Sequence, residues 1–377
     1  MKKSLLALAA LGAFAGAAHA QSSVTLYGII DAGITYVNNV KGNSQVGLTS
    51  GIEQGSRWGL KGSEDLGGGL KTVFQLENGF NVASGALGQG GRMFGRQAYV
   101  GLSGANWGTV TVGRQYDSID DYVQPATMNG NYGAYFSHAG DIDNSDNAYR
   151  VNNSIKYASP SYNGLTFGGM YAFGGTAGQF GLNSMFGLGV AYSNGPAYLA
   201  AAYEYNRNPV TQFTDGNWVA NSANPAASGP FGYVGTSTTS SQIIGIGGTY
   251  AFGPAKVGLD YTNTKFANAN GTASSVTFNT GELWGQYALT PALTLVGGYT
   301  LTAGKANYAV ATGTKPVWNQ FNFEAQYALS KRTDVYFMGV FETASGGALG
   351  SIYNGLVGST SSNKNQSLAR VGIRAKF

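Results

Sequence analysis

The sequence contains no cysteine, so neither a disulfide bond nor a cysteine-based metal site contributes to this protein. It has only two histidines, His19 and His138, and charged residues make up only 11% of the chain. Neither a G-x-S-x-G nor an H-E-x-x-H pattern occurs. Because these catalytic and metal-binding patterns are missing, we expect no enzymatic activity, no cofactor and no metal site. We interpret His138 as an incidental histidine in a long loop.

Long apolar runs are also missing beyond residue 20. No later segment approaches the ~18–20 apolar residues of a membrane helix, and no convincing amphipathic helix is present. Residues 1–20 have a basic start, an apolar middle and the ending Ala18-His19-Ala20, which predicts a signal peptide cleaved before Gln21. We therefore divide the chain into a signal peptide, residues 1–20, and one domain, residues 21–377. Loss of the two lysines in the first segment lowers the net charge from +4 to about +2, which argues against a nucleic-acid partner.

What the chain does contain is alternation of polar and apolar side chains. In residues 319–342, one parity carries Phe321, Phe323 and Tyr327, and the other carries Gln320, Asn322, Glu324 and Gln326. A period of two predicts a β-strand with one apolar and one polar face. The same split in the first strand separates Leu26, Ile30 and Ile34 from Thr25, Tyr27 and Asp31.

Alternation and turn residues together predict sixteen strands and an all-β fold. The expected strands lie near 24–37, 55–63, 69–81, 92–104, 107–116, 150–159, 164–174, 184–194, 196–207, 240–252, 254–266, 278–290, 292–304, 318–329, 332–344 and 366–377. Most of these runs hold roughly 9–13 residues, which suits a tilted strand that crosses a bilayer.

The connections between these strands are sorted by length. Short turns, such as 104–106, 194–195, 253–254 and 330–331, alternate with long loops near 38–54, 82–91, 117–149, 175–183, 208–239, 267–277, 305–317 and 345–365. This pattern predicts a sixteen-stranded antiparallel transmembrane β-barrel with short periplasmic turns and long external loops. The apolar face would then contact lipid and the polar face would line a wet lumen, and the sheet must close because lipid satisfies no backbone group.

Aromatic residues and the last strand fit the same picture. Trp58, Trp284 and Trp318 lie near expected strand ends, where an interfacial aromatic belt would place them. The final run, SLARVGIRAKF, alternates and ends on Phe377. Pairing of this run with the first strand would remove both edges of the sheet.

The chain resembles the Gram-negative general diffusion porins over essentially all of residues 21–377. The matching stretches are SVTLYGIIDAGITY, SRWGLKGSEDLGGGLKTVFQLE, FGRQAYVGLSGANWGTVTVGRQYD and the terminal Phe377. The resemblance implies an outer-membrane homotrimer in contact with lipopolysaccharide, with a third loop folded into the lumen. It also implies passive diffusion of small hydrophilic solutes and ions through a water-filled channel.

For a barrel of this kind, we predict a charged constriction between the wall and loop 117–149. Parity places Arg57 and Arg150 on the lumen face, whereas only the resemblance places Arg96 there. Asp120 and Asp121 are the expected loop carboxylates, although this loop lacks the Pro-Glu-Phe-Gly run of some relatives, which weakens its acidic side. Such charges would set a transverse field across the channel. The small positive net charge predicts a weak preference for anions.

Four more charged residues are expected to line the lumen: Lys61, Arg114, Lys156 and Glu324. Lys61 and Lys156 share the parity of Arg57 and Arg150, and Glu324 lies on the polar parity of its strand. The placement of Arg114 is ambiguous, because Val110 and Val112 share its parity.

Other functions stay open at this point. A barrel selective for one solute class, such as sugars or anions, would have the same shape. A barrel enzyme such as a lipase would need a Ser–His pair on the lipid-facing rim, and a secreted lectin-like protein is the most distant alternative.

Overall fold

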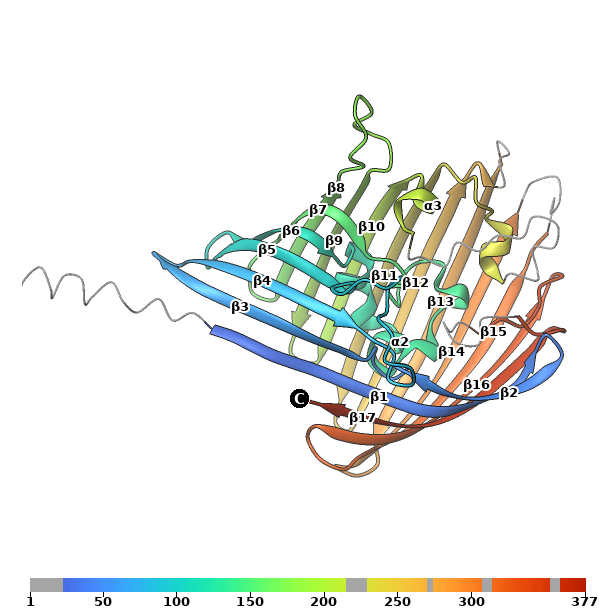
Figure 1. Ribbon diagram of the computed structural model, residues 1–377. Helices are drawn as coiled ribbons and strands as arrows, with labels where there is room; N and C mark the ends of the chain where they lie inside the picture. The colour runs from blue at the N-terminus through green and yellow to red at the C-terminus, as the bar shows by residue number, and fades with distance from the viewer. Residues whose placement is uncertain (1–22, 215–228, 270–273, 307–313, 353–359) are drawn as a thin grey trace, which may run out of the picture.

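A computed structural model describes residues 23–214, 229–269, 274–306, 314–352 and 360–377. The predicted signal peptide therefore lies outside the described residues, as do parts of four of the long loops. The chain forms one antiparallel sheet that curves round on itself (Figure 1). Its strands are β1 (Ser23–Val40), β2 (Asn43–Ser50), β3 (Arg57–Gly67), β4 (Leu70–Gly79), β5 (Gln97–Gly104), β6 (Gly108–Gln115), β7 (Val151–Ala158), β8 (Leu165–Ala172), β9 (Met185–Asn194), β10 (Ala197–Arg207), β11 (Ser240–Phe252), β12 (Ala255–Ala267), β13 (Ser275–Ala288), β14 (Leu293–Ala306), β15 (Val317–Ala328), β16 (Thr333–Ser345) and β17 (Asn365–Lys376).

These seventeen strands form a closed barrel with sixteen strand positions around its circumference, which we call staves. β2 and β3 lie end to end and together form one stave. β2 pairs with the second half of β1, and β3 pairs with its first half. The barrel closes where β17 pairs with β1, from Ile29 opposite Lys376 to Val37 opposite Leu368. The predicted fold is therefore confirmed, but the prediction of loop 38–54 was wrong in part, since eight residues of that segment form β2 and β1 extends into it as far as Val40.

The two faces of each stave divide as the alternation predicts. In β15 the side chains of Phe321, Phe323 and Tyr327 point out of the barrel and are 44–52% exposed. Gln320 and Glu324 on the opposite face are buried inside it. Exposed apolar residues recur on the neighbouring staves and cover the outer wall of the barrel.

Two of the three predicted belt tryptophans lie elsewhere. Trp284 and Trp318 are only 2% and 1% exposed, and they point into the barrel. Their indole Nε1–H groups donate to the backbone oxygens of Ala126 (2.8 Å) and Leu349 (3.0 Å), both in loops. The belt interpretation was therefore wrong for these two, because a large side chain near a strand end can also anchor a loop inside.

The connection between β6 and β7, which we call loop L3, folds inside the barrel as five short helical turns (Figure 1). They are η1 (Ile119–Val123), η2 (Gln124–Ala126), α2 (Met128–Tyr132), η3 (Ala134–Phe136) and η4 (Ala139–Asp141), and the other connections carry α3 (Pro209–Gln212) and η6 (Pro230–Tyr233). Within the described ranges, every helix is too short or too polar to span a membrane.

A buried charge network lies on the inner face where the barrel closes. Arg370 of β17 pairs with Asp31 of β1 at 3.1 Å, and both side chains are fully buried. The Tyr336 hydroxyl donates to Asp31 Oδ1 at 2.6 Å, and the Gln54 backbone N–H donates to Oδ2 at 2.8 Å. Asp31 thus ties β17, β16 and the segment between β2 and β3 to the first stave.

We predict that Asp31→Ala destabilises the barrel by about 3–5 kcal/mol, because it leaves the Arg370 guanidinium buried without a carboxylate. Denaturant unfolding of the protein in detergent, followed by heat-modified gel mobility, measures this loss. The double variant Asp31→Ala/Arg370→Leu should regain most of the stability, since no unpaired charge remains. Equal stability of the single variant and the native chain would contradict the prediction.

Candidate functional site: a constriction inside the barrel

L3 holds its shape through its own polar side chains. Asp117 Oδ1 accepts the backbone N–H groups of Ile119 (2.7 Å) and Asp120 (2.9 Å), which fixes the start of η1. The Thr127 hydroxyl accepts the Gly130 N–H at 3.1 Å and caps α2. Gly133, at φ 105°, ends α2 in a conformation that favours glycine. These local bonds explain why the loop forms short turns rather than an extended hairpin.

The wall fixes where L3 lies. Met128 and Tyr132 pack against Trp284 and other buried apolar residues of the wall, and the rings of Tyr132 and Trp284 meet edge-on at 5.8 Å. The Met128 N–H donates to Glu282 of β13 at 2.5 Å, and the Ala134 N–H donates to Ile52 O at 2.8 Å. L3 is therefore held from both sides of the lumen.

A cavity of about 550 Å³ lies between L3 and the staves that face it. Its lining includes three arginines, Arg57, Arg96 and Arg150. L3 contributes the two carboxyl groups of Asp120 and Asp146, and Tyr116, which leads into the loop, also lines it. The structure thus brings together four of the five residues predicted for the constriction.

Arg96 reaches the lumen because it precedes β5 instead of lying in it. The strand prediction began at residue 92, whereas β5 begins at Gln97, so the outward parity of Ala98 does not apply to Arg96. Its Nε donates to Glu77 Oε1 at 2.8 Å, and its Nη2 donates to the Tyr116 hydroxyl at 2.6 Å. Glu77 therefore compensates the charge of Arg96.

Arg57 and Arg150 have no such compensation. Among the described residues, no carboxylate oxygen lies within 4.0 Å of either guanidinium. Arg57 Nε donates to the backbone oxygen of Gly55 at 2.7 Å. The guanidinium carbons of Arg150 and Arg96 both lie 5.7 Å from the centroid of the Tyr116 ring, whose π electrons favour nearby cations.

The opposing carboxyl groups titrate near neutral pH. Burial, together with the nearby charges of Asp117 and Asp121, raises the pKa of Asp120 to about 7. Burial raises the pKa of Asp146 to about 6, against the opposing effects of Asn129 and Arg150. At neutral pH the arginine side of the cavity is therefore more fully charged than the acidic side.

Comparisons with known proteins agree with this architecture. The family model described as Gram-negative porin matches residues 7–347. An outer membrane porin protein of Bordetella pertussis is 34% identical over 374 residues, which are 90% of this chain and 94% of that protein. The chain belongs to the Gram-negative porin family. It forms a water-filled channel for passive diffusion in the outer membrane.

Two solved structures are similar to this porin. An anion-selective porin from Comamonas acidovorans superposes with a TM-score of 0.77 at 26% identity, over 95% of this chain and all of that one. OmpT of Vibrio cholerae, in its trimer form, has a TM-score of 0.68 at 16% identity, over 94% of this chain and 99% of that one. The second likeness concerns the fold alone.

The remaining predicted residues of this porin lie outside the cavity lining. Asp121, half of the predicted acidic side, instead pairs with Lys156 Nζ at 2.6 Å. The Nζ of Lys61 lies 5.2 Å from the centroid of the Tyr27 ring, and Glu324 is fully buried on the lumen side of β15.

The lumen prediction for Arg114 was wrong. Register pairs it with Ala98, on the outward side that also carries Val100 and Val112. Its guanidinium donates to Gly95 O at 2.8 Å and to Asn152 Oδ1 at 2.6 Å. The register between β6 and β7 shifts between Gly113 and Gln115, so Arg114 lies at a β-bulge.

Three other features escaped the sequence analysis. Tyr116 and Glu77, which organise the arginines, carry no signal in a single sequence beyond their place in strand-like runs. Asp146 is one of six aspartates in the loop, and the sequence does not indicate which of them face the channel. Only the fold of L3 shows that Asp146 lines the cavity. His138, interpreted as incidental, is instead fully buried and ion-paired at both ring nitrogens.

Proposed function

We propose that this porin prefers anions, and that Arg57, Arg96 and Arg150 on the wall and Asp120 and Asp146 on L3 set that preference. The observation that carries the proposal is the pair of arginines, Arg57 and Arg150, neither of which forms an ion pair with a carboxylate of the described residues. A passing anion is attracted by these fixed charges, and the low-dielectric wall strengthens their field. The likeness to an anion-selective porin supports the same sign.

We also propose that this channel protein has no catalytic activity. A rim enzyme would need an accessible histidine near the lipid-facing wall. His138 is enclosed inside the barrel between Asp143 and Asp260, so it does not offer that arrangement.

Arg57→Ser and Arg150→Ser should each lower the anion-to-cation permeability ratio roughly twofold. One charge at about 8 Å in water contributes about 0.5 kcal/mol to the energy of an ion, and salt screens it further. Arg57→Glu should shift the ratio further than Arg57→Ser. Reversal potentials in a salt gradient across planar bilayers provide the measurement.

The matched control for the arginine series is Lys364→Ser. Lys364 is an exposed lysine beside an outer loop, so its replacement should leave the ratio unchanged. If the native ratio persists in both serine variants, the two arginines do not set selectivity.

Anion preference should rise as the pH falls from 8 to 5. The pKa of Asp120 is about 7 and that of Asp146 about 6, so both carboxyl groups lose their negative charge over this range while the arginines keep theirs. The reversal potential measured at several pH values reports the change. Asp120→Asn/Asp146→Asn should show high anion preference and a nearly flat profile, and a flat profile in the native chain would refute the assignment.

We also propose that the porin assembles as a homotrimer through the wall that contains β5 to β8. Each of these strands has only 8 residues and, when tilted, spans about 20 Å, less than the ~25 Å apolar band of a barrel wall in lipid. Val100 and Val112 are exposed there. A partner subunit would cover this short wall, and the trimer form of a protein of similar fold agrees with that arrangement.

Native mass spectrometry of the detergent-purified porin should show three chains. Because the chain has no cysteine, Val112→Cys provides a single site for a bifunctional maleimide, which should link copies of the chain. Leu283→Cys, an exposed position on the far stave β13, should not link them. Monomers in the native spectrum would rule out the trimer.

Residues 1–20 are proposed to be the cleaved signal peptide, on the strength of the basic start and the Ala18-His19-Ala20 ending. Edman sequencing of the protein from outer-membrane fractions should begin at Gln21. A sequence that begins at Met1 in that fraction would disprove it.

A further inference from the structure

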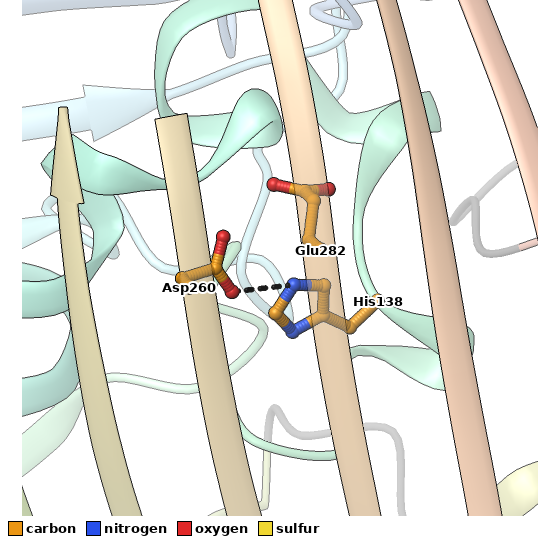
Figure 2. Close-up of side chains that lie close together, drawn as sticks. All are labelled: His138, Asp260 and Glu282. Carbon is orange, nitrogen blue, oxygen red and sulfur yellow. Dashed lines mark ion pairs between the residues drawn. The ribbon is translucent and has the colours of Figure 1, made fainter. Parts of the chain in front are cut away.

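A histidine and two carboxylates meet behind L3, away from the constriction. His138 comes from L3, Asp260 from β12 and Glu282 from β13, and all three are buried inside the barrel (Figure 2). One donor atom from each lies within 4.8 Å of the other two. The three side chains come from three separate segments, and His138 and Asp260 face one another across the ion pair drawn in Figure 2.

The ring of His138 is oriented by a fourth residue. Its Nδ1 lies 2.6 Å from Asp143 Oδ2, and Asp143 itself accepts bonds from the Thr262 hydroxyl and the Ser145 N–H. This arrangement leaves Nε2 facing the carboxylates, 3.2 Å from Asp260 Oδ1. A carboxylate on one ring nitrogen that aims the other nitrogen at a cation is the usual support of a metal-bound histidine.

The two wall carboxylates differ in their hydrogen bonds. Glu282 accepts the Met128 N–H on Oε1 (2.5 Å) and the Thr300 hydroxyl on Oε2 (3.0 Å), which fixes its direction. Asp260 is 2% exposed, yet neither of its oxygens accepts a properly directed hydrogen bond from any described residue. The His138 ring nitrogen is the one ion-pair partner of Asp260 among the described residues, and a bound cation would lower the cost of burying a carboxylate with so few partners.

Charge balance points the same way. Asp143, Asp260 and Glu282 surround a single imidazole, so even a protonated His138 leaves an excess of negative charge in a buried site. The 3.2 Å separation of Nε2 and Oδ1 is close to the roughly 3.3 Å between two ligands that each bind one Zn²⁺ ion at about 2.0–2.1 Å. A small contraction around Glu282 would complete a three-ligand site.

We propose that His138, Asp260 and Glu282 bind one divalent first-row transition cation, with Zn²⁺ as the test ion. The set of one imidazole and two carboxylates suits this class, and solvent completes the coordination. The cation takes the place of the proton between His138 Nε2 and Asp260, so binding releases that proton to solvent. The bound ion would fasten L3 to two adjacent staves and so fix the loop that narrows the channel.

Because the site is enclosed, the ion would enter while L3 docks during folding. Untagged protein should therefore be refolded from urea into detergent with ZnCl₂, desalted, and analysed by inductively coupled plasma mass spectrometry. We expect the native chain to retain about one Zn²⁺ per chain through the desalting step. A native chain that retains none overturns the proposal.

Variants of the proposed ligands test whether these residues bind the ion. His138→Gln and Asp260→Asn should each lose most of the retained zinc, whereas the control Glu342→Gln, another fully buried carboxyl position on the wall, should keep it. Heat-modified gel mobility confirms that each variant has folded. A folded His138→Gln that retains as much zinc as the native chain overturns the proposal.

Refolding with Cu²⁺ gives a readout that needs no variant. His138 is the single histidine beyond residue 20, so the electron paramagnetic resonance spectrum of the bound copper should show coupling to one imidazole nitrogen. Absence of nitrogen coupling overturns the site even if every ligand variant fails to fold.

Discussion

A strand in lipid can satisfy its backbone only through another strand, and this requirement governs the whole molecule. The barrel meets this requirement because β17 pairs with β1, so the sheet has no free edge. Closure then divides every stave into an outer apolar face and an inner face that encloses far more space than its own side chains fill. The inner space is where a loop can be placed and where charges can face water, so the channel follows from the closure.

L3 occupies that space through two kinds of contact. Apolar residues such as Met128 and Tyr132 pack against the wall near Trp284, and the backbone N–H of Met128 donates to the carboxylate of Glu282 on the wall. The contacts are spread over many staves, so the loop sits at a fixed distance from the arginine wall. Packing therefore sets the width of the constriction. The sign of its charge selectivity is set by those charged side chains that form no ion pair.

The regular part of this architecture was predictable from sequence because alternation is a local property. The faces of Phe321 and Gln320 follow from parity alone, and so does the inward direction of Arg57. Parity fails for Arg96, which lies just before β5 begins, whereas it holds for Arg114, which shares the outward side of Val112. The contacts of Trp284 with Ala126 and of His138 with Asp260 could not be read from the chain either, because each joins residues more than one hundred positions apart in sequence.

The pairing of Tyr36 with Ala369 joins positions more than three hundred residues apart. Contacts of such sequence separation form late, because the entropy of closing so long a loop must be overcome first. Until they form, the chain presents unpaired strands with alternating apolar residues to water, a state prone to aggregation. Late closure therefore makes the time between synthesis and barrel closure the period in which the chain is most exposed to aggregation, and anything that covers its strands during that time would raise the yield of folded channel.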